Sequence, residues 1–246
     1  MASQSHMKML SGESAELLIY GVVGDPEDGV AAKQVAEWLG GEAKDAERIN
    51  VRINSPGGGA RDGVAIHNLL TQHPAAIEVD VDGYAASSAS LIAMAGDVRR
   101  MHPAALMMMH DPRLDLRGTF LQQELVELIN YLETAKQSYV EIYAGRSGDS
   151  AKDVLDMMAA TTWFDGEEAV AAGYATEVVQ RPLMAACFDI AALGSIPDDK
   201  RARFESHVVK SAETAQGNEA NSLPKSTTRV EQKLRLTRRR TAHRFK

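Results

Sequence analysis

The sequence has a single cysteine, Cys187, in 246 residues. One thiol cannot form an intramolecular disulfide, which excludes the small secreted proteins whose folds depend on disulfide bonds. No run of about 18 apolar residues occurs, so we expect no membrane-spanning helix. The first residues have no basic segment followed by an apolar core, so a signal peptide is not expected. These absences predict a cytoplasmic protein, and we expect it to use neither a metal ion nor another cofactor.

Hydrophobic residues make up 44% of the chain, which is enough for one domain of ordinary size with an appendage. We divide the chain into an N-terminal segment at 1–14, partly an expression tag or disordered, a domain at 15–181 and a flexible extension at 182–246. The extension has little apolar periodicity, so we expect it to be weakly ordered. From 221 onward it has nine basic residues and one acidic residue. We expect this basic end to bind an acidic protein surface rather than nucleic acid, because no aromatic residues are interleaved with the basic ones.

The body of the chain alternates apolar strands with amphipathic helices. Strands are predicted at 15–23, 48–54 and 77–81, and helices follow the first two at 30–39 and 62–72. Regular alternation of strand and helix predicts right-handed crossovers and a parallel sheet. The predicted fold class is therefore α/β.

The segment 83–96 is the centre of this pattern. An apolar strand breaks at Gly83 and continues as a helix of small residues, which presents Ser87 at the break. A hydroxyl in the first turn of a helix lies beside unpaired N–H groups, and small neighbours leave room for a substrate. Taken alone, Ser87 or Ser88 is better explained as a helix N-cap.

Two further segments favour catalysis. The strand at 49–54 runs into the glycines at 57–59, where backbone N–H groups can point outward as an oxyanion hole requires. The buried-looking strand at 104–109 delivers His110 just before Pro112 ends it. A serine, a histidine and outward-facing amides together predict an acyl-transfer site.

Three motifs, in this order and at this spacing, resemble the Clp protease proteolytic subunit (ClpP) family: Ile53–Gly58 (INSPGG), Gly83–Ser87 (GYAAS) and Met108–Pro112 (MMHDP). The resemblance covers most of the predicted domain. Within it, Leu17–Gly24 and Thr162–Ala169 are most similar to the ClpP-like head-maturation (prohead) proteases of tailed bacteriophages.

The resemblance implies the ClpP/crotonase fold, a spiral of βαβ units, and a serine endopeptidase that works through an acyl-enzyme. It implies that Ser87 is the nucleophile and that His110 is the general base. The oxyanion hole would be formed by the backbone N–H groups of Gly57 and Ser88. From the residues alone, Ser88 and Ser90 remain rival nucleophiles.

The third member of the triad departs from the family pattern. The family has an acid where this chain has Thr161, three residues before Phe164. A threonine hydroxyl can hydrogen-bond an imidazole N–H but cannot stabilise an imidazolium by charge. Three acids are alternatives for this role: Asp111, Asp156 and Asp165. Asp165 is also explained as the cap of the helix that follows it.

The longest predicted helix runs from Thr119 to about Arg146, with apolar residues at helical spacing. Such a helix is too long to be buried within a small domain. In the ClpP family this region is the handle that interlocks two rings. The resemblance therefore implies a ring-forming homo-oligomer, with heptamers stacked in pairs as the expected form. The alternative is a helix that packs wholly on its own subunit.

The sequence leaves three functions open. The first is a phage protease that cleaves capsid or scaffold proteins during head assembly. The second is a cellular ClpP-like subunit of an ATP-dependent protease, although no axial-loop segment for docking an unfoldase is evident. The third is an assembly protein that keeps the fold and has lost the triad. A crotonase-type acyl-CoA enzyme shares the fold but needs neither Ser87 nor His110.

Overall fold

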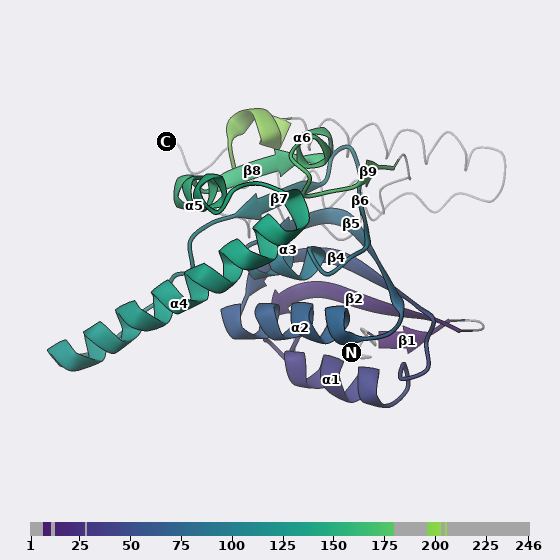
Figure 1. Ribbon diagram of the computed structural model, residues 1–246, viewed down its shortest axis with the longest axis horizontal. Helices are drawn as coiled ribbons and strands as arrows, with labels where there is room; N and C mark the ends of the chain where they lie inside the picture. The colour runs from purple at the N-terminus through teal and green to yellow at the C-terminus, as the bar shows by residue number, and fades with distance from the viewer. Residues whose placement is uncertain (1–6, 11–12, 28, 180–195, 203–204, 206–246) are drawn as a thin grey trace, which may run out of the picture. The chain divides into compact units, whose positions relative to one another are not determined.

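The computed structural model describes residues 7–10, 13–27, 29–179, 196–202 and 205, and its elements alternate between strands and helices (Figure 1). The strands are β1 Met7–Met9, β2 Ser14–Val23, β3 Gly29–Val30, β4 Arg48–Gly58, β5 Ala76–Ala86, β6 Val98–Met101, β7 Leu106–Met109, β8 Thr162–Asp165 and β9 Glu177–Val178. The helices are α1 Ala32–Gly40, α2 Ala60–Gln72, α3 Ser88–Ala93, α4 Gln122–Ser147, α5 Ala151–Ala160 and α6 Gly166–Ala171.

The described strands form one sheet in the order β1, β2, β4, β5, β6 and β9. β3 pairs with the end of β2, and β7 pairs with the end of β5 and with β8. Every pairing is parallel except β1 with β2 and β7 with β8. α1 connects β2 and β3 to β4, and α2 connects β4 to β5. The α/β fold class is confirmed, because helical crossovers join parallel neighbours as the alternating pattern predicted.

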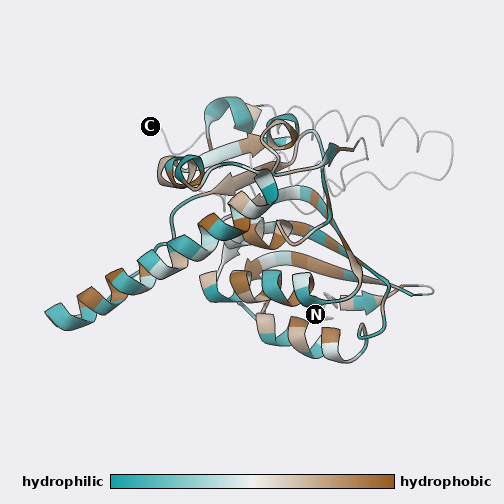
Figure 2. Cartoon of the chain, in the orientation of Figure 1, coloured by the Kyte–Doolittle hydropathy of each residue, from teal (hydrophilic) through white to brown (hydrophobic). Residues whose placement is uncertain are grey.

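The apolar core lies on the face of the sheet that the helices cover. On β4, Ile49, Val51 and Ile53 are fully buried, whereas Arg52 lies on the opposite face and donates to both carboxylate oxygens of Asp82 at 2.9 and 2.6 Å. Side chains alternate between the two faces of a strand, so this pattern follows from the sequence. Figure 2 shows apolar residues recurring along the central strands. Burying each large aliphatic side chain contributes about 1.5–3 kcal/mol.

The long helix α4 ends at Gly148, whose φ of +83° allows the left-handed turn that stops it. Its bounds, Gln122–Ser147, agree with the prediction of a helix from 119 to about 146. The second half buries Tyr139, Val140 and Tyr143. The first half is largely exposed, and Figure 1 shows it extending beyond the sheet. Apolar residues recur along this exposed half in Figure 2.

Several predicted bounds were wrong. The first helix was expected at 30–39 but begins at Ala32, because Gly29–Val30 pairs with β2 instead. α2 begins at Ala60, two residues before the predicted start, and β5 continues to Ala86. The short strands β1, β6 and β9 were not predicted at all, since each has only two to four residues and little periodicity.

Part of the predicted flexible extension is described and is packed. Residues 198–202 are helical, and Lys200 forms ion pairs with Asp165, at 3.6 Å, and with Glu168. Ile196 is 5% exposed and belongs to a second apolar cluster with Tyr84, Ala86, Ala104, Leu106, Met108 and Trp163. This packing differs from the expectation for these residues. The rest of the predicted extension, and residues 1–6, lie outside the described residues.

Among the described helices, none combines the length and the apolar character needed to cross a bilayer.

The packing of Ile196 predicts a measurable cost of truncation. We expect Ile196→Ala to lower the free energy of unfolding by about 2 kcal/mol, because buried Ile to Ala changes leave a cavity. Chemical denaturation followed by circular dichroism measures this. Leu155→Ala is the matched control, since Leu155 is 38% exposed on α5. An equally small effect of both changes would show that Ile196 does not pack on the sheet in solution.

Candidate active site

The backbone at the end of β4 requires a glycine at position 57. Gly57 has a φ of +85°, and a Cβ atom at this position would lie 2.5 Å from the carbonyl oxygen of Ala86 and 2.8 Å from Ser87 Cβ. No other residue can take this place without displacing backbone. The end of β4 therefore touches the turn that carries Ser87.

Ser87 lies in a strained turn between β5 and α3. It is one of two described non-glycine residues with positive φ, with φ 55° and ψ −126°. Its N–H donates to the carbonyl oxygen of Met108 on β7 at 2.9 Å. Such a conformation costs about 1–3 kcal/mol and persists only when its surroundings hold it. The hydroxyl of Ser87 is therefore carried by a turn between a strand and a helix.

His110 follows β7, which pairs in parallel with the end of β5 up to Ala86 and Met108. This pairing brings the residues after both strands together. His110 Nε2 and Ser87 Oγ are 2.7 Å apart, within hydrogen-bond distance. The predicted serine and histidine are thus in contact, although they lie 23 positions apart in the chain.

The surroundings of His110 favour its neutral form. Burial lowers the pKa of His110, and the nearby Arg113 guanidinium lowers it further. The Asp111 carboxylate and a backbone hydrogen bond with Asp111 act in the opposite direction, but the net pKa lies below the usual imidazole value. A neutral imidazole can accept the proton of Ser87, as a general base must.

The rival serines do not meet His110. Ser90 Oγ lies 2.6 Å from the carbonyl oxygen of Ser87, 2.9 Å from that of Met108 and 2.7 Å from Tyr143 Oη. Ser88 is buried, and its Oγ has no hydrogen-bond partner among the described residues. Ser87 is therefore the serine of this turn whose hydroxyl contacts the histidine.

The structure differs at Gly57 from the predicted oxyanion hole. Its N–H donates to Ser55 Oγ at 3.0 Å, and Ser55 Oγ in turn donates to the carbonyl oxygen of Gly21 at 2.6 Å. The Gly57 amide is therefore hydrogen-bonded, whereas we expected it to face outward without a partner. Ser88 is the first residue of α3, where N–H groups lack intrahelical acceptors. A Cβ at Gly57 would lie 2.9 Å from Ser88 N, so this amide borders the same space.

Thr161 lies at the end of α5, exposed, with a φ of 55°. Extending the register of β7 and β8 by one position sets it opposite His110, but no hydrogen bond joins the two side chains. Among the described residues, no carboxylate hydrogen-bonds to the His110 ring.

The three alternative acids are engaged elsewhere. Asp111 forms an ion pair with Lys136 at 2.9 Å, and Asp156 pairs with Lys152 at 2.5 Å. Asp165 caps α6 by accepting from the N–H groups of Glu167 and Glu168, which confirms its predicted capping role.

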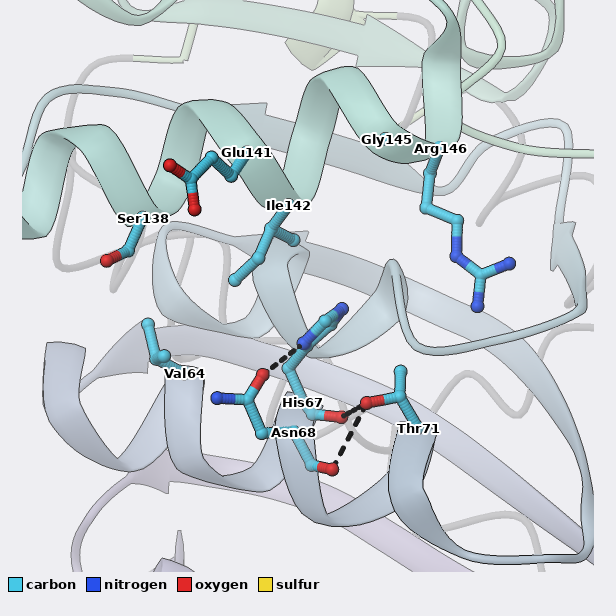
Figure 3. A pocket seen from close by; sticks show the side chains of 9 residues that line it. All are labelled: Val64, His67, Asn68, Thr71, Ser138, Glu141, Ile142, Gly145 and Arg146. Atoms are coloured by element: carbon cyan, nitrogen blue, oxygen red, sulfur yellow. Dashed lines mark hydrogen bonds between the residues drawn. The ribbon is translucent and has the colours of Figure 1, made fainter.

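A cavity of about 320 Å³ opens at the Ser87–His110 pair. Its lining includes the glycine turn, and its full set of residues is Val22, Pro56, Gly57, Gly58, Ala60, Ser87, His110, Pro112, Arg113 and Tyr139. A separate cavity of about 420 Å³ lies between α2 and α4, where His67 Nδ1 is 3.0 Å from Asn68 Oδ1 (Figure 3). Figure 3 shows that cavity lined by neither Ser87 nor His110. Within the described part of the chain, no three His, Cys, Asp or Glu residues are grouped as a metal site requires.

The largely parallel sheet brings a strained serine, a histidine and a glycine turn to one cavity. This arrangement is that of an α/β protein with the site geometry of a serine hydrolase. A family model described as Clp protease matches residues 7–182. The chain belongs to the Clp protease family, whose members are serine-type peptidases.

Curated relatives agree with this assignment. The ATP-dependent Clp protease proteolytic subunit of Streptococcus gordonii is 27% identical over 161 residues, which cover 64% of this chain and 82% of the relative. The subunit of the same description from Streptococcus suis (strain 98HAH33) is 28% identical, with the same coverage. A solved structure of a ClpP1 mutant from Listeria monocytogenes is similar in fold, with a TM-score of 0.58 at 22% identity, covering 68% of this chain and 91% of that one.

The lowered pKa of His110 predicts the acidic limb of the pH profile. Because a histidine that acts as general base must be neutral, a catalytic role of His110 predicts that kcat/KM for a fluorogenic peptide stays high below the usual imidazole value of 6.5 and falls only at lower pH. Arg113→Gln removes a positive charge, so the pKa of His110 should rise and the limb should move to higher pH.

Arg117→Gln is the control, since Arg117 is exposed in the same segment and pairs with Asp115. A wild-type limb above 6.5, or a limb that Arg113→Gln leaves in place, would contradict this description of His110.

Proposed function

We propose that this chain is a serine endopeptidase that cleaves peptide bonds through an acyl-enzyme at Ser87. The single observation that carries the proposal is the 2.7 Å contact between Ser87 Oγ and His110 Nε2 at the mouth of a cavity. Membership of the Clp protease family supports the reaction class.

In the proposed mechanism His110 accepts the proton of Ser87 as Oγ attacks the carbonyl carbon of the substrate. His110 then gives that proton to the leaving amine, and a water molecule hydrolyses the acyl-enzyme by the reverse proton transfers. The N–H of Ser88 would donate to the oxyanion. Gly57 would join it by exchanging Ser55 Oγ for the substrate oxygen. Losing one such donor costs about 10²–10³ in rate.

We propose two alternatives for the third member of the triad, the group that orients the His110 ring. Thr161 is in register with His110 and would orient the ring if its hydroxyl turned inward. In the second form the backbone of Asp111, which raises the pKa of His110, would accept from the imidazole N–H and hold the tautomer. Neither form supplies a negative charge to the imidazolium, so we expect turnover to be slower than with a buried carboxylate.

We propose that the biological role is maturation of a phage head by cleavage of capsid or scaffold proteins. The similarity of Leu17–Gly24 and Thr162–Ala169 to prohead proteases supports this role. The names of the curated relatives favour a second candidate, a subunit that degrades substrates delivered by an ATPase. A neighbouring gene for a portal or major capsid protein would favour the first, and stimulation of proteolysis by ATP with an unfoldase would favour the second.

Removing the nucleophile tests the reaction. Ser87→Ala keeps Cβ and the turn, so the thermal unfolding temperature should be nearly unchanged, while kcat/KM for a fluorogenic peptide should fall by about 10³-fold or more. Ser138→Ala on α4 is the control. Activity that survives in Ser87→Ala and disappears in Ser88→Ala would overturn the assignment of Ser87.

The exposed half of α4 supports the proposed assembly. Leu121, Leu125 and Ile129 follow one another at four-residue intervals and are 70%, 40% and 58% exposed. A stripe of apolar residues on a helix surface is stable when another surface covers it. We propose that a second copy does so, in stacked rings of which heptamers are the expected form.

Breaking this stripe tests the assembly. The wild-type chain should have a mass several times its 26.7 kDa in multi-angle light scattering, and Leu125→Ser with Ile129→Ser should reduce that mass. Glu133→Gln, at another exposed position of α4, should not. A monomeric wild-type chain, or a double variant of unchanged mass, would refute the role of α4.

A further inference from the structure

A second cavity adjoins the one at Ser87. It has a volume of about 400 Å³ and shares Gly58, Ala60, Pro112 and Arg113 with the cavity at the Ser87–His110 pair. Because the two share a wall, a peptide bound at Ser87 can reach the second cavity with a side chain close to the scissile bond.

Two arginines line this adjoining cavity. Arg61, in the first turn of α2, has its guanidinium carbon 4.9 Å from the centre of the Tyr131 ring, and its Nε donates to Tyr131 Oη at 3.3 Å. These contacts hold the arginine by stacking and leave its terminal nitrogens for another acceptor. Arg113 is exposed and forms no ion pair with a described acid.

The acids nearby are already engaged. Asp62 also lines the cavity, but its Oδ1 accepts from the N–H of Ala32 at 2.8 Å. Asp111, beside His110, is paired with Lys136 at 2.9 Å. The two guanidinium groups outnumber the one Asp62 carboxylate in the lining, so the cavity has excess positive charge, although the chain as a whole has a net charge of −7.

The rest of the wall is apolar. Leu114, Tyr131 and Leu132 line it together with Gly58, Gly59, Ala60 and Pro112. A ligand that suits it has a short aliphatic stem and an anionic end, and a glutamate side chain has both. Arginine binds carboxylate with two parallel hydrogen bonds, which lysine cannot do.

We infer that Arg113 and Arg61 form a subsite for an acidic side chain of the substrate, so that the enzyme prefers a glutamate or aspartate near the scissile bond. The inference rests on the proposed peptidase function, because the subsite adjoins Ser87. It makes these arginines determinants of specificity that touch no reacting atom, although the charge of Arg113 also lowers the pKa of His110.

Matched peptides test the preference. A set of fluorogenic peptides carries Glu or Gln in turn at each of four positions on either side of the scissile bond. At one position the Glu peptide should be cleaved with about tenfold higher kcat/KM, and the ratio should shrink as salt is raised, because surface ion pairs are screened.

Variants assign the preference to the two arginines. Arg113→Gln and Arg61→Gln should each bring the Glu to Gln ratio towards one, and Arg113→Lys should keep part of it. Arg113→Glu should reverse it in favour of a Lys peptide. Arg117→Gln is the matched control and should keep the wild-type ratio, since Arg117 is 89% exposed and pairs with Asp115.

Binding separates this inference from the proposed function. Fluorescence anisotropy of the same labelled peptides on the Ser87→Ala variant reads the preference without turnover. Tighter binding of the Glu peptide, lost on adding Arg113→Gln, would support the subsite. If the wild-type chain then cleaved none of the peptides, that result would contradict only the peptidase proposal. Equal binding and equal cleavage of Glu and Gln peptides at every position would overturn the subsite and leave the peptidase proposal standing.

Discussion

The close approach of Gly57 to Ser87 is the constraint on which the site depends. A Cβ at position 57 would overlap the backbone at Ala86, so only glycine allows the end of β4 to touch the turn after β5. That contact and the pairing of β5 with β7 hold Ser87 at positive φ beside His110. The serine hydroxyl and the imidazole consequently border one cavity, and the Ser88 amide lies beside Gly57 in its wall, as the proposed acyl transfer requires.

A buried hydrogen-bond network around Ser90 stabilises this strained turn. Ser90 Oγ joins the carbonyl oxygens of Ser87 and Met108 to the hydroxyl of Tyr143 on α4. Burial raises the pKa of Tyr143, so its hydroxyl stays protonated and can donate. A satisfied buried network of this kind is rigid, because breaking one bond leaves other polar groups unpaired. The helix proposed to carry assembly contacts therefore also holds the turn of the proposed nucleophile.

The alternation of strands and helices predicted the α/β fold, and apolar residues at helical spacing predicted the long helix. The three motifs predicted that Ser87 and His110 would meet. They could not predict that Ser55 Oγ would accept from the Gly57 amide, since that bond depends on a side-chain rotamer. The packing of Ile196 was missed for a similar reason: the segment that contains it has little regular apolar periodicity, and its partners are distant in the chain. The sequence did not reveal that Thr161 would lie exposed at the position opposite His110, because exposure depends on how α5 packs.

The central claim is that the strained turn makes Ser87 the nucleophile. A fluorophosphonate probe reacts with an activated serine, and tandem mass spectrometry of the digested adduct identifies the modified residue. The account predicts a single adduct on Ser87, which disappears on His110→Ala because the general base is removed. An adduct on Ser88 or Ser90, or no adduct on folded wild-type protein, would contradict it.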